Sequence, residues 1–308
     1  MENGKSARYR SLTSYLTERF GCRVFRVSLD AGLTCPNKDG TKGRGGCSFC
    51  NSSTLAVTPD ADQRGIREQL LEGMAYLRKR RRADKFIAYL QQNSNTYAPI
   101  ECLERLYGEA TDHPDVVALA VSTRPDCLGE EVLKLLETFA RKIDLWVELG
   151  LQSASEATLA ALNRGHTATD FEKALAGATA RDIPVCAHVI LGLPGESRAD
   201  MIGTARLLAR HNVWGVKIHP LHIQKGTRLE ALYREGTVRV LDLDEYAERV
   251  VDFLEELPPR TIIHRLCGST PKRFLVAPSW GSDRFTPPAV IRELLEALET
   301  HQGAKYAP

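Results

Sequence analysis

The sequence predicts an α/β protein in which parallel strands alternate with helices that cover the sheet. Two observations predict this class: short β-branched apolar runs alternate with stretches whose apolar residues recur at helical spacing, and polar motifs follow the runs. Strands separated by helices need crossover connections, which favour a parallel sheet, either a barrel or a doubly wound sheet. In both arrangements, binding sites gather at the carboxyl ends of the strands.

Six strand–helix units follow one another along the chain. We expect strands at residues 24–29, 86–90, 116–121, 145–149, 185–191 and 213–218. We expect helices near residues 64–80, 100–110, 128–139, 155–162, 169–180 and 199–209. We interpret the segment after Pro258 as an appended lid or a closing strand.

Each of the first five strands is followed by a polar segment. A long loop at 30–62 follows the first strand and carries three cysteines. The next four strands are followed by QQNSNT (91–96), STRPD (122–126), GLQS (150–153) and GLPGE (192–196). Because the carboxyl ends of parallel strands meet at one edge of a sheet, these segments are expected to share a cleft.

Composition limits the class of protein. At 308 residues, with 43% hydrophobic and 26% charged residues, the chain can bury a full core as one large domain. The formal net charge of +2 is too small to indicate a nucleic-acid binder, so any basic footprint has to be local. No window reaches the roughly 18 apolar residues that a membrane span needs. Five of the eight cysteines are scattered singly, which favours a reducing compartment, so we expect a soluble, cytoplasmic protein.

The loop at 30–62 carries the clearest chemical signal. Cys47 and Cys50 form a CxxC pair, and Cys35 precedes them in a stretch rich in Gly, Lys and Asn. Three thiolates can ligate three irons of a 4Fe–4S cubane and leave the fourth iron open to a chelating molecule, for which the amino and carboxylate groups of S-adenosylmethionine (SAM) are suited. Glycines 40, 43, 45 and 46 let the backbone bend around such a cluster.

Two other interpretations apply to the same cysteines. A structural zinc site usually has four close ligands, and a second cysteine pair is absent. A thiol–disulfide motif begins a helix after a strand and would leave Cys35 unused. The cluster is therefore favoured over zinc, and zinc over redox thiols. The five single cysteines are interpreted as buried small apolar residues.

The motifs resemble those of the radical SAM superfamily, and within it the Elongator-protein-3-like (Elp3-like) group with its bacterial YhcC/YtqA-type branch. The resemblance extends from about residue 15 to residue 280. It is carried by TCPNKDG (34–40), GGCSFC (45–50), SNTYAP (94–99), STRPD (122–126), ELGLQS (148–153), LNRGHT (162–167) and LGLPGE (191–196). Most superfamily members place three residues between the first two cysteines, whereas this chain places eleven, which is similar to the Elongator-type subgroup.

The resemblance implies a partial (β/α)6 radical SAM barrel with short N-terminal and C-terminal extensions. The implied boundaries are an N-terminal helical extension at 1–22, a core at 23–256 with the cluster loop at 30–62, and a C-terminal closing segment at 257–308. The implied metal ligands are Cys35, Cys47 and Cys50.

The resemblance also implies which residues contact SAM. Phe49 would pack near the adenine, and Gly192 and Gly195 would pass their backbone against it. Glu148 would accept from the ribose hydroxyls, with Gln152 nearby. The remaining implied contacts are Gln91 and Asn93 for the amino group, with Ser122, Arg124, Arg164 and His166 toward the carboxylate.

Each of these assignments has an ordinary structural alternative. A buried carboxylate such as Glu148 is costly unless it is paired, and a salt bridge with Arg124 would serve equally well. Arg124 also precedes Pro125, as at a helix start. A lone histidine in a turn, such as His166, is more often structural, and the glycines suit a strand-to-helix turn.

The function that the resemblance implies is reductive cleavage of SAM to methionine and a 5′-deoxyadenosyl radical, with electrons from a flavodoxin or ferredoxin. Residues 78–82 (RKRRR) carry more positive charge than a helix end needs, and a phosphate backbone would be a natural partner. Because the Elongator-like group is associated with tRNA wobble uridines, tRNA is the expected substrate. The alternatives are a radical SAM enzyme acting on a small molecule or peptide, and a non-catalytic zinc-containing nucleic-acid-binding protein.

Overall fold

The computed structural model of the protein describes residues 8–51 and 64–307. The chain divides into two compact units. The cysteine unit comprises Leu16–Leu151 and Asn163–Cys186, and the C-terminal unit comprises Gln152–Leu162 and Ala187–Pro308 together with the residues before Leu16. Residues 52–62 of the predicted cluster loop lie outside the described residues.

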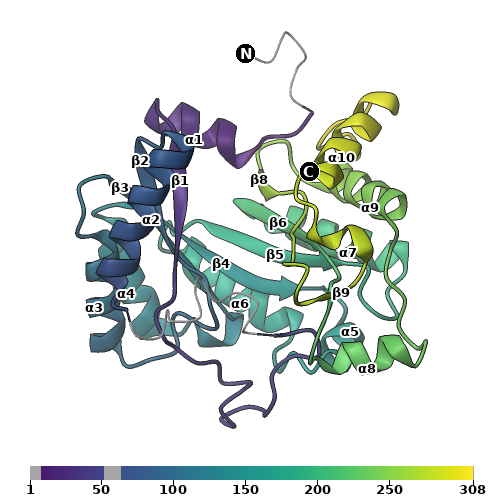
Figure 1. The fold of residues 1–308 in the computed structure, drawn as a ribbon, viewed down its shortest axis with the longest axis horizontal. Coiled ribbons are helices and arrows are strands. Elements are labelled where there is room, and N and C mark those ends of the chain that lie inside the picture. The colour runs from purple at the N-terminus through teal and green to yellow at the C-terminus, as the bar shows by residue number, and fades with distance from the viewer. Residues whose placement is uncertain (1–7, 52–63, 308) are drawn as a thin grey trace. The chain divides into compact units, whose positions relative to one another are not determined.

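The cysteine unit alternates strands and helices in the predicted order (Figure 1). Strands β1 to β4 pair in parallel, each with the next, so every connection is a crossover. The elements are β1 (Val24–Leu29), α2 (Ile66–Arg81), β2 (Lys85–Leu90), α3 (Ile100–Thr111), β3 (Val116–Thr123), α4 (Glu130–Ala140), β4 (Asp144–Gln152), α6 (Ala168–Thr179) and the start of β5 (Val185–Leu191). Helix α1 (Leu12–Phe20) precedes them.

Burial explains why these strands are apolar along their whole length. In β2 five of six residues are buried, and Ile87, Leu119 and Val147 are fully so. A strand whose two faces are both covered has no reason to alternate polar and apolar residues. Helix α2 approaches β1 so closely that a Cβ at Gly73 would overlap the side chain of Val27.

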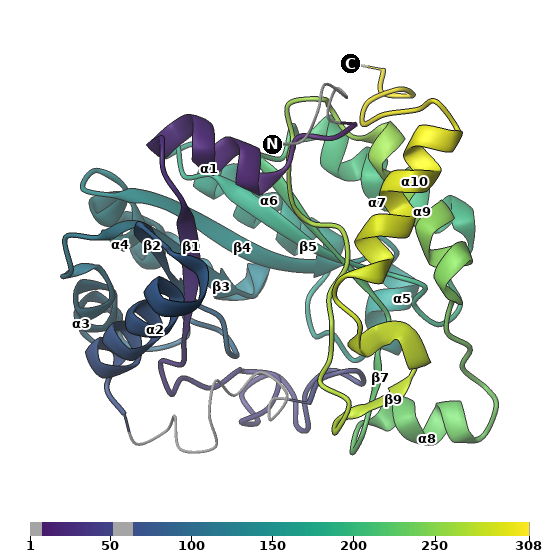
Figure 2. The ribbon, with the colours of Figure 1, turned by 45° about the horizontal axis from the view of Figure 1, so that its top comes forward.

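The C-terminal unit contains the end of β5 and the later elements (Figure 2). Strand β8 pairs in parallel with β6, whereas β7 and β9 form a separate antiparallel pair. Helix α10 packs against α9. The elements are α5 (Glu156–Ala161), α7 (Arg198–Arg210), β6 (Gly215–Pro220), β7 (Ile223–Gln224), α8 (Arg228–Arg234), α9 (Leu243–Glu256), β8 (Ile262–Arg265), β9 (Leu275–Ala277) and α10 (Thr286–Ala297).

Residues near the start of the described chain belong to the C-terminal unit. The amide of Ile263 donates to the carbonyl of Arg10 (2.8 Å), and Ser11 bridges to Ile263 in parallel. The amide of Gln302 donates to the carbonyl of Arg8 (2.9 Å). This corner of the unit therefore joins chain segments from opposite ends of the sequence.

The α/β class and the parallel, barrel-like sheet are confirmed, with strand order β1-β2-β3-β4-β5-β6-β8. The sixth strand begins at Gly215 instead of residue 213, because the amide of Val213 closes the end of α7 by donating to the carbonyl of Leu208. Residues 262–265 form a seventh strand of the sheet. In the part of the chain that the structure describes, no helix is long and apolar enough to cross a membrane.

Candidate functional site

The cysteine loop is a series of tight turns between residues 30 and 51. Amides of Lys38 and Lys42 donate to the carbonyls of Cys35 and Pro36, each at 2.8 Å. Gly45 and Gly46 follow one another with φ of +81° and +79°, a conformation that other residues adopt only with strain. The amide of Gly46 donates to the carbonyl of Asn37 (2.8 Å), which closes the loop on itself.

The three cysteines of the loop lie near one another. Cys35 and Cys47 are buried and Cys50 is partly exposed, and the amide of Cys50 donates to the carbonyl of Cys47 (2.9 Å). Burial raises the pKa of Cys50, and the neighbouring thiols Cys47 and Cys35 raise it further although Lys38 opposes them. Burial also acts to raise the pKa of Cys47, but Arg164, Arg124 and Asn37 outweigh it and the pKa is lowered.

A turn at residues 163–165 holds the loop from one side. The Asn37 side chain, which sequence reasoning did not single out, donates through Nδ2 to the carbonyl of Asn163 (2.7 Å) and lies 3.6 Å from Cys47 Sγ. Asn163 Nδ2 donates back to the carbonyl of Gly46 (3.0 Å). Arg164 donates through Nη1 to Cys47 Sγ (3.3 Å) and through Nη2 to the carbonyl of Gly150 (2.8 Å).

Gly165 completes this turn with φ of +70°. A Cβ there would lie 3.1 Å from Asn37 Oδ1 and 3.4 Å from Arg124 Nη2. The absent side chain thus makes room for two groups that surround the loop.

The segment after β2 holds the loop from the other side. Asn93, with φ of +56°, accepts from Lys38 Nζ (2.8 Å) and donates to the carbonyl of Leu33 (2.8 Å). Gln91 Oε1 instead accepts a long hydrogen bond from Ser28 Oγ (3.5 Å). The Ser122 carbonyl accepts from both the amide and the Nδ2 of Asn95.

Arg124 does not pair with Glu148, so that alternative is wrong. Its guanidinium makes a bidentate contact with Asp126, in which Nε and Nη2 lie 2.9 and 3.1 Å from the two carboxylate oxygens. Lys42 Nζ lies 2.7 Å from the same carboxylate. The physical reason is proximity in sequence: a carboxylate two residues away needs no long-range alignment. A 3₁₀ turn follows at Pro125–Cys127, as the alternative of a helix start predicts.

Glu148 is fully buried on β4. Its carboxylate accepts from Tyr89 Oη (2.7 Å) and Trp146 Nε1 (3.3 Å), and Arg26 Nη1 lies 4.0 Å away. The neutral donors Tyr89 and Trp146 help to hold this carboxylate in place. At the end of the same strand, Gln152 has φ of +75°, which is uncommon for a residue with a side chain.

The contacts of His166 fit the alternative that this histidine has a structural role. Nδ1 lies 3.1 Å from the carbonyl of Thr167, and Nε2 lies 3.1 Å from the carbonyl of Gly150. Burial lowers the pKa of His166 to about 3, and Arg164 lowers it too, so the ring is neutral near pH 7. Both ring nitrogens already face backbone oxygens, which leaves neither directed at a ligand.

Three further residues of predicted motifs belong to the C-terminal unit. Gly192 has φ of +81°, and a Cβ there would meet the Leu241 side chain at 2.8 Å, so a neighbouring leucine accounts for this glycine. Gly195 has the same φ, with open space where a Cβ would be. Burial raises the pKa of Glu196 to about 7 although Ser153 and Thr158 hydrogen-bond to it.

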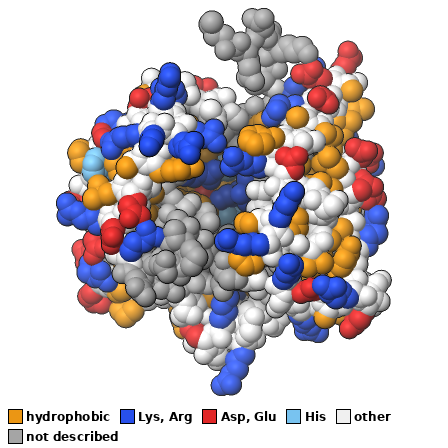
Figure 3. All heavy atoms as spheres, in the orientation of Figure 1, with side chains coloured by type: hydrophobic (Ala, Val, Ile, Leu, Met, Phe, Trp, Pro, Cys, Tyr) orange, Lys and Arg blue, Asp and Glu red, His pale blue; other side chains and the backbone are white. Residues whose placement is uncertain are grey.

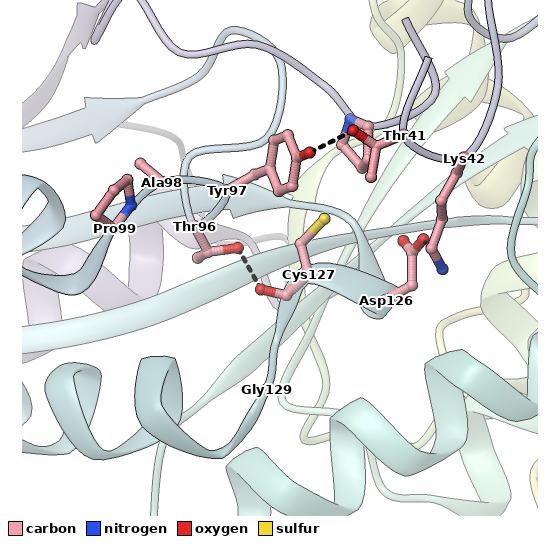
Figure 4. A pocket seen from close by; sticks show the side chains of 10 residues that line it. Thr41, Lys42, Thr96, Tyr97, Ala98, Pro99, Asp126, Cys127 and Gly129 are labelled. Atoms are coloured by element: carbon pink, nitrogen blue, oxygen red, sulfur yellow. Dashed lines mark hydrogen bonds and ion pairs between the residues drawn. The ribbon is translucent and has the colours of Figure 1, made fainter. Parts of the chain in front are cut away.

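A pocket of ≈ 510 Å³ opens beside the loop within the cysteine unit (Figure 4). Tyr97 Oη hydrogen-bonds to Thr41 Oγ1 at its edge (2.8 Å), and Thr96 Oγ1 donates to the carbonyl of Cys127 (2.6 Å). The Cys127 side chain lies between Tyr97 and Asp126 in this view. Burial raises the pKa of Cys127 to about 12, and Asp126 adds to it, so this thiol is protonated near neutral pH.

Several buried polar atoms around the loop have no hydrogen-bond partner within residues 8–51 and 64–307. They are Ser48 Oγ, Asn95 Oδ1, Arg124 Nη1 and Arg164 Nε. Buried polar groups in native proteins are nearly always satisfied, so these atoms fit a site that a polar ligand completes. Three thiols and two guanidinium groups are a donor set suited to an iron–sulfur cluster with an amino-acid carboxylate beside it.

Comparison with known families agrees with this donor set. The model of the radical SAM superfamily matches residues 39–208, and that of the radical SAM C-terminal domain matches residues 213–296. The chain therefore belongs to the radical SAM superfamily. It is an enzyme whose cofactors are a 4Fe–4S cluster and SAM. Cys35 precedes the matched range, in keeping with the long gap between the first two cysteines.

Two relatives are similar over most of their length. YtqA of Bacillus subtilis is 36% identical over 296 residues, which cover 96% of this chain and 92% of that protein. YhcC of Escherichia coli K12 is 38% identical over 273 residues, which cover 88% of this chain and 87% of that protein. The tRNA uridine(34) acetyltransferase of Dehalococcoides mccartyi is 27% identical over 164 residues, which cover 52% of this chain and 35% of that protein.

Among solved structures, the archaeal Elp3 of Methanocaldococcus infernus is similar with a TM-score of 0.71. The match covers 91% of this chain and 64% of that chain at 18% sequence identity. This likeness shows that the two proteins share a fold.

Proposed function

We propose that Cys35, Cys47 and Cys50 hold the 4Fe–4S cluster and that the enzyme acts on a tRNA nucleoside, the wobble uridine. What supports the ligand set is that one closed loop carries all three thiols and that Asn37 and Arg164 reach Cys47 Sγ from a separate turn. When bound, the reduced cluster supplies the electron that cleaves SAM and starts hydrogen abstraction.

The residues around the loop would bind and orient SAM. Arg124 Nη1 and Arg164 Nε, both buried and without partners in the described chain, are the donors we assign to its carboxylate, with Ser122 beside them. Gln91 and Asn93 are assigned to the amino group, together with the orphaned Asn95 Oδ1. Such groups are satisfied by a ligand at no cost in reorganisation.

The remaining contacts concern the nucleoside part of SAM. Glu148, held by Tyr89 and Trp146, is assigned to the ribose hydroxyls. Phe49, half-buried in the CxxC turn, is assigned to the adenine. His166 is assigned no ligand contact, because both of its ring nitrogens face carbonyls.

The proposal that the substrate is tRNA depends on sequence similarity and on surface charge. Proteins named tRNA uridine(34) acetyltransferase match about half of this chain. Lys79, Arg80, Arg81 and Arg82 are exposed at the end of α2, and no ion pair involves them within the described residues. Lys and Arg side chains gather over this end of α2 in Figure 3. Unpaired exposed cations are what a phosphate backbone binds.

The position of this run in the chain supports a role away from the reacting base. It precedes β2, whereas the cysteine loop is tied to the segment that follows β2. The run would therefore hold RNA away from the reacting base. A flavodoxin or ferredoxin would supply electrons, and a cytoplasmic location agrees with eight free cysteines.

The decisive test compares two triple charge reversals in the reconstituted enzyme. Changing Arg80, Arg81 and Arg82 to Glu should weaken tRNA binding and reduce the log–log salt slope by about 0.7 to 0.9 per lost phosphate contact, without affecting SAM cleavage. The matched control changes the exposed Lys134, Lys142 and Lys173 to Glu and should leave affinity close to the unmodified enzyme.

Equal affinities in both triple variants would show the run to be a solvated helix end. An unaltered tRNA nucleoside profile in a deletion strain would move the substrate to small molecules or peptides.

A further inference from the structure

Asn37 is a buried residue of the cysteine loop, with only 1% of its surface exposed. Its Nδ2 carries two hydrogens and has two partners: the carbonyl of Asn163 at 2.7 Å and Cys47 Sγ at 3.6 Å. The carbonyl of Asn163 decides which amide atom faces the sulfur, because a flipped amide would bring its oxygen against that carbonyl. An N–H group therefore points at Cys47 Sγ.

Two glycines fix the orientation of this amide. A Cβ at Gly43 would overlap Asn37 Oδ1, and a Cβ at Gly165 would lie 3.1 Å from the same oxygen. Backbone from two different turns thus packs against Oδ1, which leaves Nδ2 directed at the sulfur.

Arg164 brings a second donor to the same sulfur. It is 7% exposed, and its Nη1 lies 3.3 Å from Cys47 Sγ. Its Nη2 donates to the carbonyl of Gly150 on β4 (2.8 Å). Because the guanidinium is planar and rigid, the contact with Gly150 aims Nη1 at the sulfur. Cys47 therefore receives one neutral and one charged donor in a buried place, where hydrogen bonds are stronger than in water.

Hydrogen bonds to the sulfur ligands of an iron–sulfur cluster act on its reduction potential. Reduction adds a negative charge that the ligand sulfurs share, so N–H donors and a positive charge stabilise the reduced state more than the oxidised state. The low dielectric constant of a buried site enlarges this preference. Donors at Cys47 Sγ therefore raise the potential of a cluster that this thiolate ligates.

We propose that Asn37 and Arg164 are positioning residues that raise the reduction potential of the cluster through Cys47, so that an external electron donor can reduce it. The inference rests on the proposed function in taking Cys47 as an iron ligand. The role is separate from SAM binding: Asn37 Nδ2 and Arg164 Nη1 contact the sulfur, whereas Arg164 Nε is the atom assigned to the SAM carboxylate.

The experiment measures the midpoint potential of the anaerobically reconstituted enzyme without SAM, by redox titration that follows the electron paramagnetic resonance signal of the reduced cluster. Asn37→Leu removes the donor from a side chain of similar size and should make reduction about threefold to tenfold less favourable, as expected for one lost hydrogen bond. For a one-electron couple this is a fall of about 30 to 60 mV.

Variants of Arg164 separate its charge from its donor geometry. Arg164→Met removes both and should lower the potential further than Asn37→Leu does. Arg164→Lys keeps the charge but lacks the planar fork, so its potential should lie between those of Arg164→Met and the unmodified enzyme.

Asn163→Gly is the matched control. Asn163 Nδ2 donates to the carbonyl of Gly46 (3.0 Å), so this variant also removes a hydrogen bond between the loop and the turn, but it leaves Asn37 Nδ2 both of its partners. Asn163 has φ of +51°, which glycine adopts readily. The potential should stay close to that of the unmodified enzyme. An equal fall in Asn163→Gly and Asn37→Leu would overturn the inference, because the position of the loop would then set the potential.

Iron content separates this inference from the ligand set. Unchanged potentials in Asn37→Leu and Arg164→Met, at the iron content of the unmodified enzyme, would overturn the inference and leave Cys47 as a ligand. Full iron content and an unchanged potential in Cys47→Ala would overturn the ligand assignment and the inference with it. Should Asn37→Leu retain too little iron to titrate, Arg164→Lys decides in its place: a lower potential supports the inference, and an unchanged one overturns it.

Discussion

At the scale of single residues, Cys47 lies among polar and positively charged side chains. Asn37 and Arg164 both direct N–H groups at its sulfur, and Arg124 adds positive charge. Hydrogen bonds to sulfur and nearby positive charge favour the thiolate, which is the form that ligates iron. At Cys50 the positive charges that act to lower the pKa are those of Lys38 and Arg164, and burial outweighs them.

The first prediction concerns the ligand set. Replacing Cys35, Cys47 or Cys50 with Ala should abolish the broad visible absorption of the anaerobically reconstituted enzyme, because a cubane needs all three thiolates. Iron and sulfide analysis checks it, with about four irons per chain expected in the unmodified enzyme. Cys127→Ala is the sharpest control, since this thiol is close enough to Cys35 to feel its charge. Loss of iron in Cys127→Ala, or stoichiometric zinc in place of iron, would contradict the three-cysteine site.

The second prediction concerns Glu148. Glu148→Gln keeps the shape and removes the charge, so SAM affinity measured by calorimetry should fall about tenfold while the iron content stays the same. Tyr89→Phe should have a smaller effect in the same direction, because it removes one of the donors that hold the carboxylate. Normal SAM binding by Glu148→Gln would identify Glu148 as a structural residue.

Residue types that carry chemistry were predictable, whereas their partners were less so. Cysteines at a recognisable spacing and a carboxylate within an apolar strand stand out in any sequence. The pairing of Arg124 with Asp126 was not predicted, because a long-range partner was weighed and the carboxylate two residues away was not. Asn37 gave no signal beyond its place in TCPNKDG, since a buried amide looks like any loop asparagine.

At the scale of elements, the cysteine loop depends on a turn far along the chain. Asn37 and Asn163 are 126 positions apart, yet each donates to the backbone of the other's segment. Both motifs were visible in the sequence, but nothing in a sequence pattern shows that two turns touch. A side chain at Gly165 would crowd Asn37 and Arg124 in this turn.

The third prediction follows from that turn. Gly165→Ala should cost about 1 to 2 kcal/mol from the positive φ alone, and the added methyl group would also press on Asn37 and Arg124. We therefore expect lower iron content and faster loss of the cluster in air. Gly108→Ala, within helix α3 with open space around it, should be neutral or stabilise the protein by roughly 0.5 to 1 kcal/mol. Equal iron retention in both variants would show that the turn does not support the loop.

Helices α8, α9 and α10 were not located from the sequence. In α9 the apolar residues Tyr246, Val250 and Leu254 recur at helical spacing, so the pattern of this helix could have located it, and its buried residues also include Asp252, Glu255 and Glu256. Ion pairs explain how these carboxylates are tolerated: Arg198 contacts Asp252, and Arg206 Nε lies 3.0 Å from Glu256. Charges buried against a neighbouring helix follow no periodicity that a single sequence reveals.

At the scale of the whole molecule, the pH dependence of stability provides the fourth prediction. The pKa of Glu196 rises from its ordinary value of 4.5 to about 7, chiefly because of burial. Between these two values the unfolded chain releases the proton while the folded chain keeps it. The free energy of unfolding should therefore fall as pH rises through this window, and each pKa unit corresponds to about 1.4 kcal/mol.

Glu196→Gln should remove this fall in the free energy of unfolding with rising pH. Urea unfolding under anaerobic conditions should find the variant more stable than the unmodified enzyme at pH 8 and nearly equal to it at pH 5. Glu293→Gln, an exposed glutamate on α10, should follow the unmodified enzyme at both values. A Glu196→Gln advantage that is independent of pH would mean that the carboxyl does not titrate in this range.

The contact between residues 8–11 and the last part of the chain bears on how the protein is made. Arg8 and Arg10 reach partners that lie 292 positions later. At a synthesis rate of ~5–20 residues per second, the ribosome adds the partners of these arginines about 15 to 60 s after the arginines themselves. The cysteine unit is complete by residue 186, so it is free to fold during that interval. Strand β8 gains its contact with the start of the chain only after the helices before it have emerged, which makes the closing of this corner a late event in every molecule's synthesis.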